Sequence, residues 1–243
     1  MKRTPHFSFY VATVLLAVGS SSVAAADDGS GPLGVTTVAA PTTQAARVGA
    51  LFAGGRHFCT ASVVHSPRHD LIVTAAHCLD GDLDDDLVFV PGYRNGRAPY
   101  GRWKIERRYL PDGWAKGEDE DSDVAFAAVA ERGDREGVED VVGANRFVTG
   151  VATGATAVTV TGYPSSRDVP ISCTNKPVAH SRTQQRIDCP DFTGGTSGSP
   201  WVNGDGQVVG VLGGHEEGGA TADISYSVVL GAEAASLYRD ASN

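Results

Sequence analysis

Short apolar runs rich in β-branched residues, separated by turn residues, dominate the first half of this chain. Residues 48–52, 58–64 and 71–74 are such runs, and glycine, proline and charged residues lie between them. Runs of this kind in close succession are typical of a β-barrel or a β-sandwich. The sequence therefore predicts an all-β fold and argues against a parallel α/β sheet.

The amino terminus has the layout of a secretory signal peptide. Two basic residues at positions 2 and 3 precede a mostly apolar stretch over residues 7–19, and small residues follow up to Ala26. This layout predicts a signal peptide over residues 1–26. A membrane anchor is the alternative, but the apolar stretch is too short to span a bilayer. We therefore expect a secreted, extracellular protein.

The segment after the predicted cleavage site differs from the rest of the chain. Residues 27–47 are small and polar, contain proline and show no periodic apolar pattern, which predicts a propeptide or a loose N-terminal arm. Residues 48–243 remain for the folded domain. The formal net charge of −9 argues against nucleic acid and anionic membranes as partners, because both repel an acidic protein. We expect a monomer.

The chain contains four cysteines, and export makes two disulfides the expected arrangement. Four cysteines allow three pairings. We prefer Cys59–Cys78 and Cys173–Cys189, which are local and do not cross. Each bond would close a loop of under ~25 residues and contribute roughly 3 kcal/mol in the chain-entropy model. A zinc site is disfavoured because no Cys-x-x-Cys motif is present.

The stretch from Asp191 to Pro200 is the main candidate for chemistry. Gly194, Gly195 and Gly198 surround Ser197, and an apolar segment follows. Glycines let a backbone turn tightly, so that successive N–H groups face one point. A serine hydroxyl becomes a nucleophile only with a base beside it and donors for the oxyanion. A plain turn between two strands is the alternative, and a matching histidine and carboxylate decide between them.

The histidine stands in the sequence Thr74-Ala75-Ala76-His77-Cys78 at the end of a predicted strand. This sequence resembles the histidine motif of the chymotrypsin-like serine peptidases. The resemblance makes His77 the general base and pairs Cys78 with a cysteine on the preceding strand, where Cys59 stands. Small alanines allow a short helical turn to pack closely at this point.

The carboxylate predicted by the same resemblance is Asp123. It begins Asp123-Val124-Ala125-Phe126, which matches the family pattern Asp-(Ile/Val)-Ala-(Leu/Phe). A carboxylate there accepts the histidine N–H and fixes the tautomer. Asp119 and Asp121 lie nearby but do not precede a buried strand.

The resemblance implies a fold and an activity. Two packed antiparallel six-stranded β-barrels, over about residues 48–130 and 141–232, are followed by a short C-terminal helix. His77 takes the proton of Ser197, Asp123 orients His77, and the N–H groups of Gly195 and Ser197 form the oxyanion hole. The chain is then a serine endopeptidase that acts on protein or peptide substrates through an acyl-enzyme. A catalytically inactive binding module of the same fold is the alternative.

The serine motif departs from the pancreatic form Gly-Asp-Ser-Gly-Gly-Pro. Here it reads Gly-Thr-Ser-Gly-Ser-Pro, which is more similar to the bacterial secreted branch that contains the glutamyl endopeptidases, as is Gly162-Tyr163-Pro164. Thr196 replaces the acid that pairs with a new amino terminus in the pancreatic enzymes. We therefore expect activity that does not depend on such an ion pair.

The sequence leaves open whether the enzyme prefers a basic, an acidic, or a small or apolar substrate residue before the cleaved bond. Leu212 stands where the glutamyl branch has a histidine, and His215 lies three residues later. Asp191 stands six residues before Ser197, in the register of the acidic pocket residue of trypsin-like enzymes. A buried carboxylate there would favour arginine or lysine, whereas a solvated one would not. Gly213 and Gly214 complete the predicted substrate-binding set.

Two other groups of residues suggest metals, but neither pattern fits. Residues 80–86 contain five aspartates, yet Asp85 and Pro91 stand where an EF-hand requires glycine and glutamate. A solvated acidic loop is the better interpretation. His65 and His69 are four residues apart, which suits a metal on a helix, but Pro67 favours a surface turn. We expect no metal and no cofactor.

Overall fold

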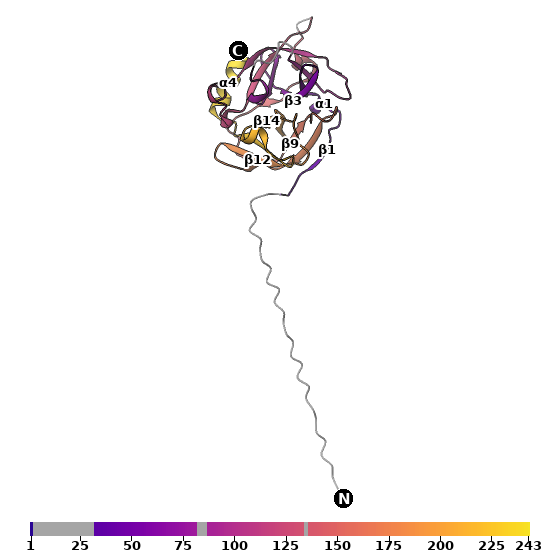
Figure 1. Ribbon diagram of the computed structural model, residues 1–243, viewed down its shortest axis with the longest axis vertical. Coiled ribbons are helices and arrows are strands. Elements are labelled where there is room, and N and C mark those ends of the chain that lie inside the picture. The colour runs from indigo at the N-terminus through magenta and orange to yellow at the C-terminus, as the bar shows by residue number, and fades with distance from the viewer. Residues whose placement is uncertain (2–31, 82–86, 134–135) are drawn as a thin grey trace.

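The computed structural model describes residues 1, 32–81, 87–133 and 136–243. The predicted signal peptide beyond Met1 and most of the acidic loop therefore lie outside the described residues. Figure 1 shows two β-rich halves, with the earlier strands in indigo and magenta and the later ones in orange.

Six strands of the first half form a closed antiparallel barrel in the order β2-β3-β4-β7-β6-β5. Closure leaves no strand edge exposed, and alternate side chains such as Leu51, Phe89 and Trp103 fill the interior with almost no exposure. This half is one of the two predicted six-stranded barrels. The strands are β2 Val48–Ala53, β3 Arg56–Val63, β4 Leu71–Thr74, β5 Val88–Pro91, β6 Trp103–Tyr109 and β7 Ala125–Val129.

The second half is a curled sheet of six strands, in the order β1-β10-β9-β13-β14-β8, beside a three-stranded sheet, β11-β12-β15. The predicted all-β class is confirmed, but the strands of this half divide between two sheets instead of closing as one six-stranded barrel. The disulfide Cys173–Cys189 joins the two sheets. The strands are β8 Arg146–Phe147, β9 Val158–Gly162, β10 Ile171–Asn175, β11 Val178–Ala179, β12 Gln184–Asp188, β13 Pro200–Asn203, β14 Gln207–Val211 and β15 Ile224–Val228.

Part of the segment expected to be a propeptide or loose arm belongs to this second half. β1 (Val35–Val38) pairs antiparallel with β10, and Ala39 behind it is buried. A short helix, α1 (Thr43–Ala46), follows, and its first turn is capped by the Thr42 hydroxyl. The described part of this segment thus supplies an edge strand.

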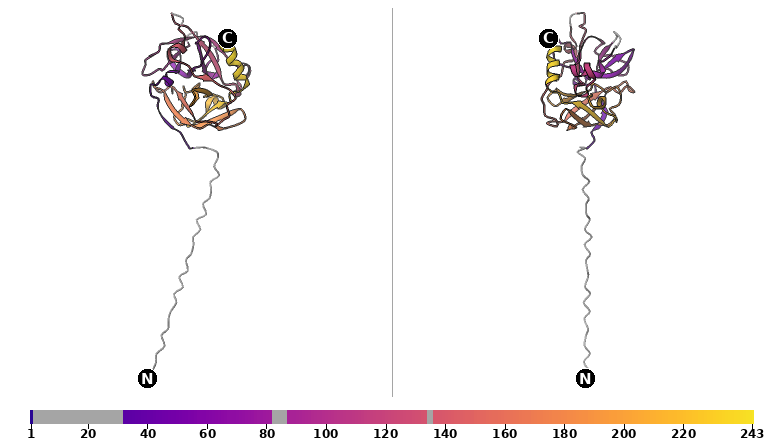
Figure 2. Two further views of the ribbon diagram at one scale, coloured as in Figure 1. Left: turned by 180° about the vertical axis from the view of Figure 1, so that it is seen from behind. Right: turned by 60° about the vertical axis from the view of Figure 1, so that its left-hand side comes forward.

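The two halves share an apolar core. Val73 and Phe126 of the first barrel pack in one cluster with Val202 and Val211 of the curled sheet. The predicted C-terminal helix, α4 (Ala232–Ser242), joins this cluster through Ala234 and packs beside β7. Figure 2 shows α4 on the outside of the molecule, next to the first half.

The remaining helices are short and lie in connections between strands. None of the helices in the described part of the chain is long and apolar enough to cross a membrane. These helices are α2 Asp112–Gly117, α3 Val138–Val142 and the 3₁₀ turns η1 Ala76–Cys78, η2 Glu120–Ser122 and η3 His215–Gly218.

Candidate active site

His77 lies in η1, directly after β4. Ala75 and Ala76 have no exposed surface, so the turn packs closely against the barrel, as their small size allows. Cys78 is bonded to Cys59 of β3, which fixes the far end of the turn. Both disulfides thus have the pairing predicted from the sequence. The His77 side chain keeps 13% exposure.

Asp123 lies at the entrance of β7 and has no exposed surface. One carboxylate oxygen accepts the backbone N–H of His77 at 3.0 Å, and the other lies 2.7 Å from His77 Nδ1. The second oxygen also accepts the N–H of Gly214 at 2.7 Å. Three N–H groups thus stabilise this buried carboxylate. The ring contact places the His77 proton on Nδ1 and leaves Nε2 free to accept a proton.

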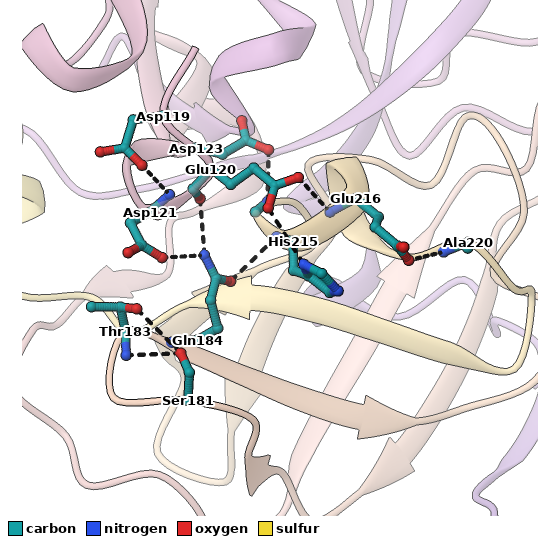
Figure 3. Close-up of polar contacts among 11 residues, drawn as sticks. Asp119, Glu120, Asp121, Asp123, Ser181, Thr183, Gln184, His215, Glu216 and Ala220 are labelled. Atoms are coloured by element: carbon teal, nitrogen blue, oxygen red, sulfur yellow. Dashed lines mark hydrogen bonds and ion pairs between the residues drawn. The ribbon is translucent and has the colours of Figure 1, made fainter. Parts of the chain in front are cut away.

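The neighbouring acids have other partners. Asp119 accepts the N–H of Asp121, and the Asp121 carboxylate accepts an amide proton of Gln184. Both side chains belong to exposed residues, and Figure 3 shows them turned toward the η2 backbone and Gln184. The structure thus separates Asp123 from the two rivals that the sequence offers.

Ser197 lies in the turn that precedes β13, and its carbonyl accepts the N–H of Thr60 at 2.7 Å. Gly198 has a φ of +82°, and a Cβ there would lie 2.1 Å from the Thr60 carbonyl and from Thr74 Oγ1. Only glycine fits this contact. The turn is thereby held against the end of β4, from which the chain leads to His77. The structure thus brings the serine loop beside the His77–Asp123 pair.

The loop before Ser197 orients its N–H groups. The Gly194 carbonyl accepts the N–H of Ser165 at 2.8 Å. Because the peptide bond is trans, the N–H of Gly195 points away from Ser165. Within the described residues, the N–H groups of Gly195 and Ser197 have no hydrogen-bond acceptor. These are the two N–H groups that the sequence predicts to form the oxyanion hole.

Thr60 is a residue that the sequence interpretation missed. Its hydroxyl donates to the Gly195 carbonyl at 3.0 Å and accepts the N–H of Tyr163 at 2.9 Å. It is completely buried on β3 of the first barrel. Thr60 therefore fixes the predicted oxyanion loop of the second half from the opposite barrel. A threonine in a strand is ordinary, so the sequence carries no signal for this role.

Gly213 and Gly214 lie directly against the predicted triad. A Cβ at Gly213 would lie 2.6 Å from an Asp123 oxygen. His215 follows them, and its ring stacks on His180 at a centroid distance of 4.9 Å. Tyr226 packs edge-on against both rings. Three of the predicted substrate-binding residues therefore border the site.

Gln184 of β12 connects the segment around His215 to η2, which directly precedes Asp123. Its amide nitrogen donates to the Glu120 carbonyl and to Asp121, each at 2.9 Å, and its oxygen accepts the N–H of His215 at 3.4 Å. The side chain of Glu120 bonds the N–H of Glu216 (Figure 3). Gln184 is buried, and nothing in its local sequence identifies it as part of a site.

Asp191 does not have the buried setting that a basic-residue pocket requires. Its side chain is 59% exposed and lies 3.7 Å from the Arg167 guanidinium. Its φ of +71° places it in a left-handed turn at the surface. A hydrated carboxylate is screened by water and exerts little pull on a substrate cation. The interpretation of Asp191 as a solvated loop acid fits this geometry.

The cysteine–histidine group at the site cannot hold a metal. Potential ligand atoms of Cys59, His77 and Cys78 lie close together, but the two sulfurs are joined in the disulfide. Cysteine binds metals as a thiolate, and neither sulfur of a disulfide is a thiolate.

A closed barrel that presents a histidine–aspartate pair to a glycine-rich serine loop of a second curled sheet defines the trypsin-like fold. The chain belongs to the trypsin-like peptidase domain family, whose model matches residues 59–211. The resemblance noted in the sequence is thereby confirmed.

The chain is also similar to individual bacterial peptidases in sequence and in structure. A glutamyl endopeptidase of Bacillus licheniformis is 31% identical over 137 residues, which are 53% of this chain and 41% of that protein. The crystal structure of the protease Anisep from Arthrobacter nicotinovorans has a TM-score of 0.74 and 29% identity, covering 86% of this chain and 99% of its own. A thermostable serine protease, AL20, has a TM-score of 0.73 and 26% identity over 83% of this chain and 99% of its own.

Proposed function

We propose that this protein is a serine endopeptidase in which Ser197 is the nucleophile, His77 the general base and Asp123 the residue that orients His77. The observation that carries the proposal is the buried Asp123 carboxylate bonded to His77, with the Ser197 turn held beside them. Family membership supports peptidase activity, and the complete set of three residues argues against an inactive binding module.

The proposed reaction uses each group in turn. His77 Nε2 takes the Ser197 hydroxyl proton as the oxygen attacks the substrate carbonyl carbon. The N–H groups of Gly195 and Ser197 stabilise the resulting oxyanion. His77 then gives its proton to the leaving amine, the peptide bond breaks, and an acyl-enzyme remains. A water molecule, with His77 again as the base, then attacks the acyl-enzyme. This step releases the carboxylic acid product and regenerates Ser197.

A cavity beside the oxyanion loop supports a peptide as substrate. It has a volume of about 500 Å³, and Ser165, whose N–H bonds the Gly194 carbonyl, lines it together with Phe58 and Tyr93. Gly213 and Gly214, which the sequence predicts to bind substrate, border Asp123. We propose that an extended peptide laid over Ser197 contacts this cavity and the Gly213–Gly214 segment.

For the residue before the cleaved bond, we expect no preference for arginine or lysine, because Asp191 is exposed and paired with Arg167. The curated relative is called a glutamyl endopeptidase, but Leu212 occupies the position of the histidine in that branch and is buried. Fluorogenic peptides with Glu, Phe, Ala or Arg before the cleaved bond determine the preference directly.

We also propose that the protein is exported, which the two disulfides and the predicted signal peptide support. Activity is not proposed to need a new amino terminus. Thr196 is buried, and its hydroxyl donates to the Thr193 carbonyl at 2.8 Å, so the position holds no carboxylate for an amine. One extra residue before the mature amino terminus should leave activity in place.

Covalent labelling tests the proposal. A fluorescent peptidyl phosphonate should label the wild-type protein and should not label Ser197→Ala. Peptide hydrolysis should be lost in parallel. A folded wild-type protein that is neither labelled nor active would support the binding module instead.

A further inference from the structure

A second group of histidines and acids lies outside the proposed active site. We call His65, His69, Glu139 and Asp140 the histidine–carboxylate cluster. His65 Nδ1 lies 2.7 Å from a Glu139 oxygen, and His69 Nδ1 lies 2.6 Å from an Asp140 oxygen. One potential ligand atom from each of His65, His69 and Glu139 lies within 4.8 Å of the other two.

The backbone brings the two histidines together without a helix. The chain turns between β3 and β4, with the N–H of His69 donating to the Ser66 carbonyl at 3.0 Å. This turn places the two imidazole centroids 6.2 Å apart. The sequence suggested a metal at these two histidines only if a helix brought them together. A turn that contains Pro67 brings them together instead.

Helix α3 is fixed against this turn. The N–H of Glu139 donates to the His69 carbonyl at 3.0 Å. A Cβ at Gly137 would lie 2.4 Å from the same carbonyl, so the close approach depends on glycine. The two halves of the cluster therefore have a defined position relative to each other before any ligand binds.

Both carboxylates are oriented in the same way. Glu139 accepts the N–H of Ser66 at 3.1 Å with one oxygen and faces His65 with the other. Asp140 accepts the N–H of Gly137 at 2.9 Å with one oxygen and faces His69 with the other. A backbone amide thus holds one oxygen of each acid and leaves the other oxygen beside an imidazole. For Asp140 and His69, this is the arrangement that orients histidine ligands in metal sites.

We propose that the histidine–carboxylate cluster binds a divalent transition-metal cation of the zinc type. His65, His69 and Glu139 are the protein ligands, Asp140 orients His69, and water completes the coordination. Zinc bonds of 2.0–2.2 Å place tetrahedral ligand atoms roughly 3.4 Å apart. Small rotations of these partly exposed side chains bring the ligand atoms from within 4.8 Å to that spacing.

The donor set determines the class of cation. Two imidazole nitrogens with carboxylate oxygen suit Zn²⁺, Ni²⁺ and Cu²⁺, whereas Ca²⁺ and Mg²⁺ prefer oxygen ligands alone. The Glu139 and Asp140 carboxylates beside the two imidazoles also supply negative charge that attracts a cation. The nearby Arg68 guanidinium is bonded to Asp70 and to the Ala241 carbonyl, so its hydrogen bonds are directed away from the cluster.

A metal here would join two parts of the chain, and a third part is attached to one of them by a hydrogen bond. The cluster links the turn between β3 and β4 with α3, in the connection between the two halves. The Tyr238 hydroxyl of α4 donates to the His65 carbonyl at 2.5 Å. Since a ligand that binds only the folded state stabilises it, zinc at ~100 times its dissociation constant should add ~2.7 kcal/mol. That stabilisation corresponds to a rise in Tm of about 5–10 °C for a domain of this size.

Titration calorimetry with ZnCl₂ and thermal unfolding of the untagged protein near neutral pH test the site. Wild type should bind one zinc ion and show the rise in Tm, and CaCl₂ should cause neither. His65→Gln and His69→Gln should each weaken zinc binding more than about 10-fold, the lower end of the loss for residues that merely support a ligand. His180→Gln, which alters an exposed histidine elsewhere, is the matched control and should bind as wild type does.

Electron paramagnetic resonance of bound Cu²⁺ provides a second readout. Nitrogen couplings from two imidazoles should appear in wild type and fall to one in His65→Gln. Circular dichroism of the metal-free variants shows whether they are folded. Absence of zinc binding in wild type overturns the proposal. Undiminished binding in both histidine variants, which would place the ion elsewhere, for example at His77, also overturns it.

Discussion

Asp123 accepts two hydrogen bonds from His77, one from the ring at 2.7 Å and one from the backbone N–H at 3.0 Å. The pairing of β4 with β7 accounts for this double contact, because Thr74 lies opposite Ala125. His77 follows Thr74 by three residues, and Asp123 precedes Ala125 by two. The ring and the backbone of His77 are therefore positioned by the same carboxylate.

Asp123→Asn tests this relationship. An amide retains the shape of the side chain but cannot favour the Nδ1 proton, so the His77 tautomer changes. We expect kcat for a cleaved peptide to fall by about 10⁴-fold with a small change in KM. Stopped assays of peptide hydrolysis measure both values, and thermal unfolding serves as the control for folding. A variant that is folded and nearly as active as wild type would contradict the role of Asp123.

Thr60→Val tests whether the first barrel holds the oxyanion loop. The change leaves the Gly195 carbonyl and the Tyr163 N–H without the Thr60 hydroxyl, which should cost about 1–3 kcal/mol of stability. We expect kcat to fall, but by less than the ~10²–10³-fold lost when an oxyanion donor itself is removed. Thr60→Ser keeps the hydroxyl and should retain most of the stability and most of the kcat of wild type. If valine and serine behave alike, the hydrogen bonds of Thr60 do not matter.

Asp191→Ala tests the exposed acid in front of the serine loop. Because Asp191 is 59% exposed and paired with Arg167, its removal should change kcat/KM by no more than a few fold for any peptide in the panel. Peptides with Arg and Glu before the cleaved bond are compared in wild type and variant. A selective loss of arginine cleavage would restore Asp191 as a pocket residue.

His57 should make stability depend on pH. Burial lowers the pKa of His57, and the nearby Asp168 carboxylate opposes this only partly. Below the ordinary histidine pKa of 6.5, the unfolded chain therefore binds a proton more readily than the folded chain, and stability falls as pH falls. The stability of wild type relative to His57→Phe should decline as the pH falls below the ordinary histidine pKa of 6.5. Urea unfolding at several pH values measures the free energy of unfolding of both proteins. A difference between them that does not change with pH contradicts the prediction.

The sequence predicted much of this site because the relevant residues lie in short, local patterns. Small alanines before His77, an apolar strand after Asp123 and glycines around Ser197 are each dictated by close packing at one point of the chain. The two disulfides followed from proximity in sequence. Thr60 and Gln184 had no such pattern. Each acts across the boundary between the halves, on residues more than 60 positions away, so only the fold reveals it.

The sequence by itself determined the all-β class and the first barrel, because strand periodicity and tight turns are local properties. Its resemblance to the chymotrypsin-like peptidases also singled out His77, Asp123 and the serine loop as candidates for the site. Tertiary structure alone decided that Asp191 stays in solvent and that the segment around Val35 becomes an edge strand. It also decided that His65 and His69 meet Glu139 and Asp140. Burial, strand partners and ligand clusters depend on residues brought together from distant parts of the chain, and their positions follow from packing the whole molecule.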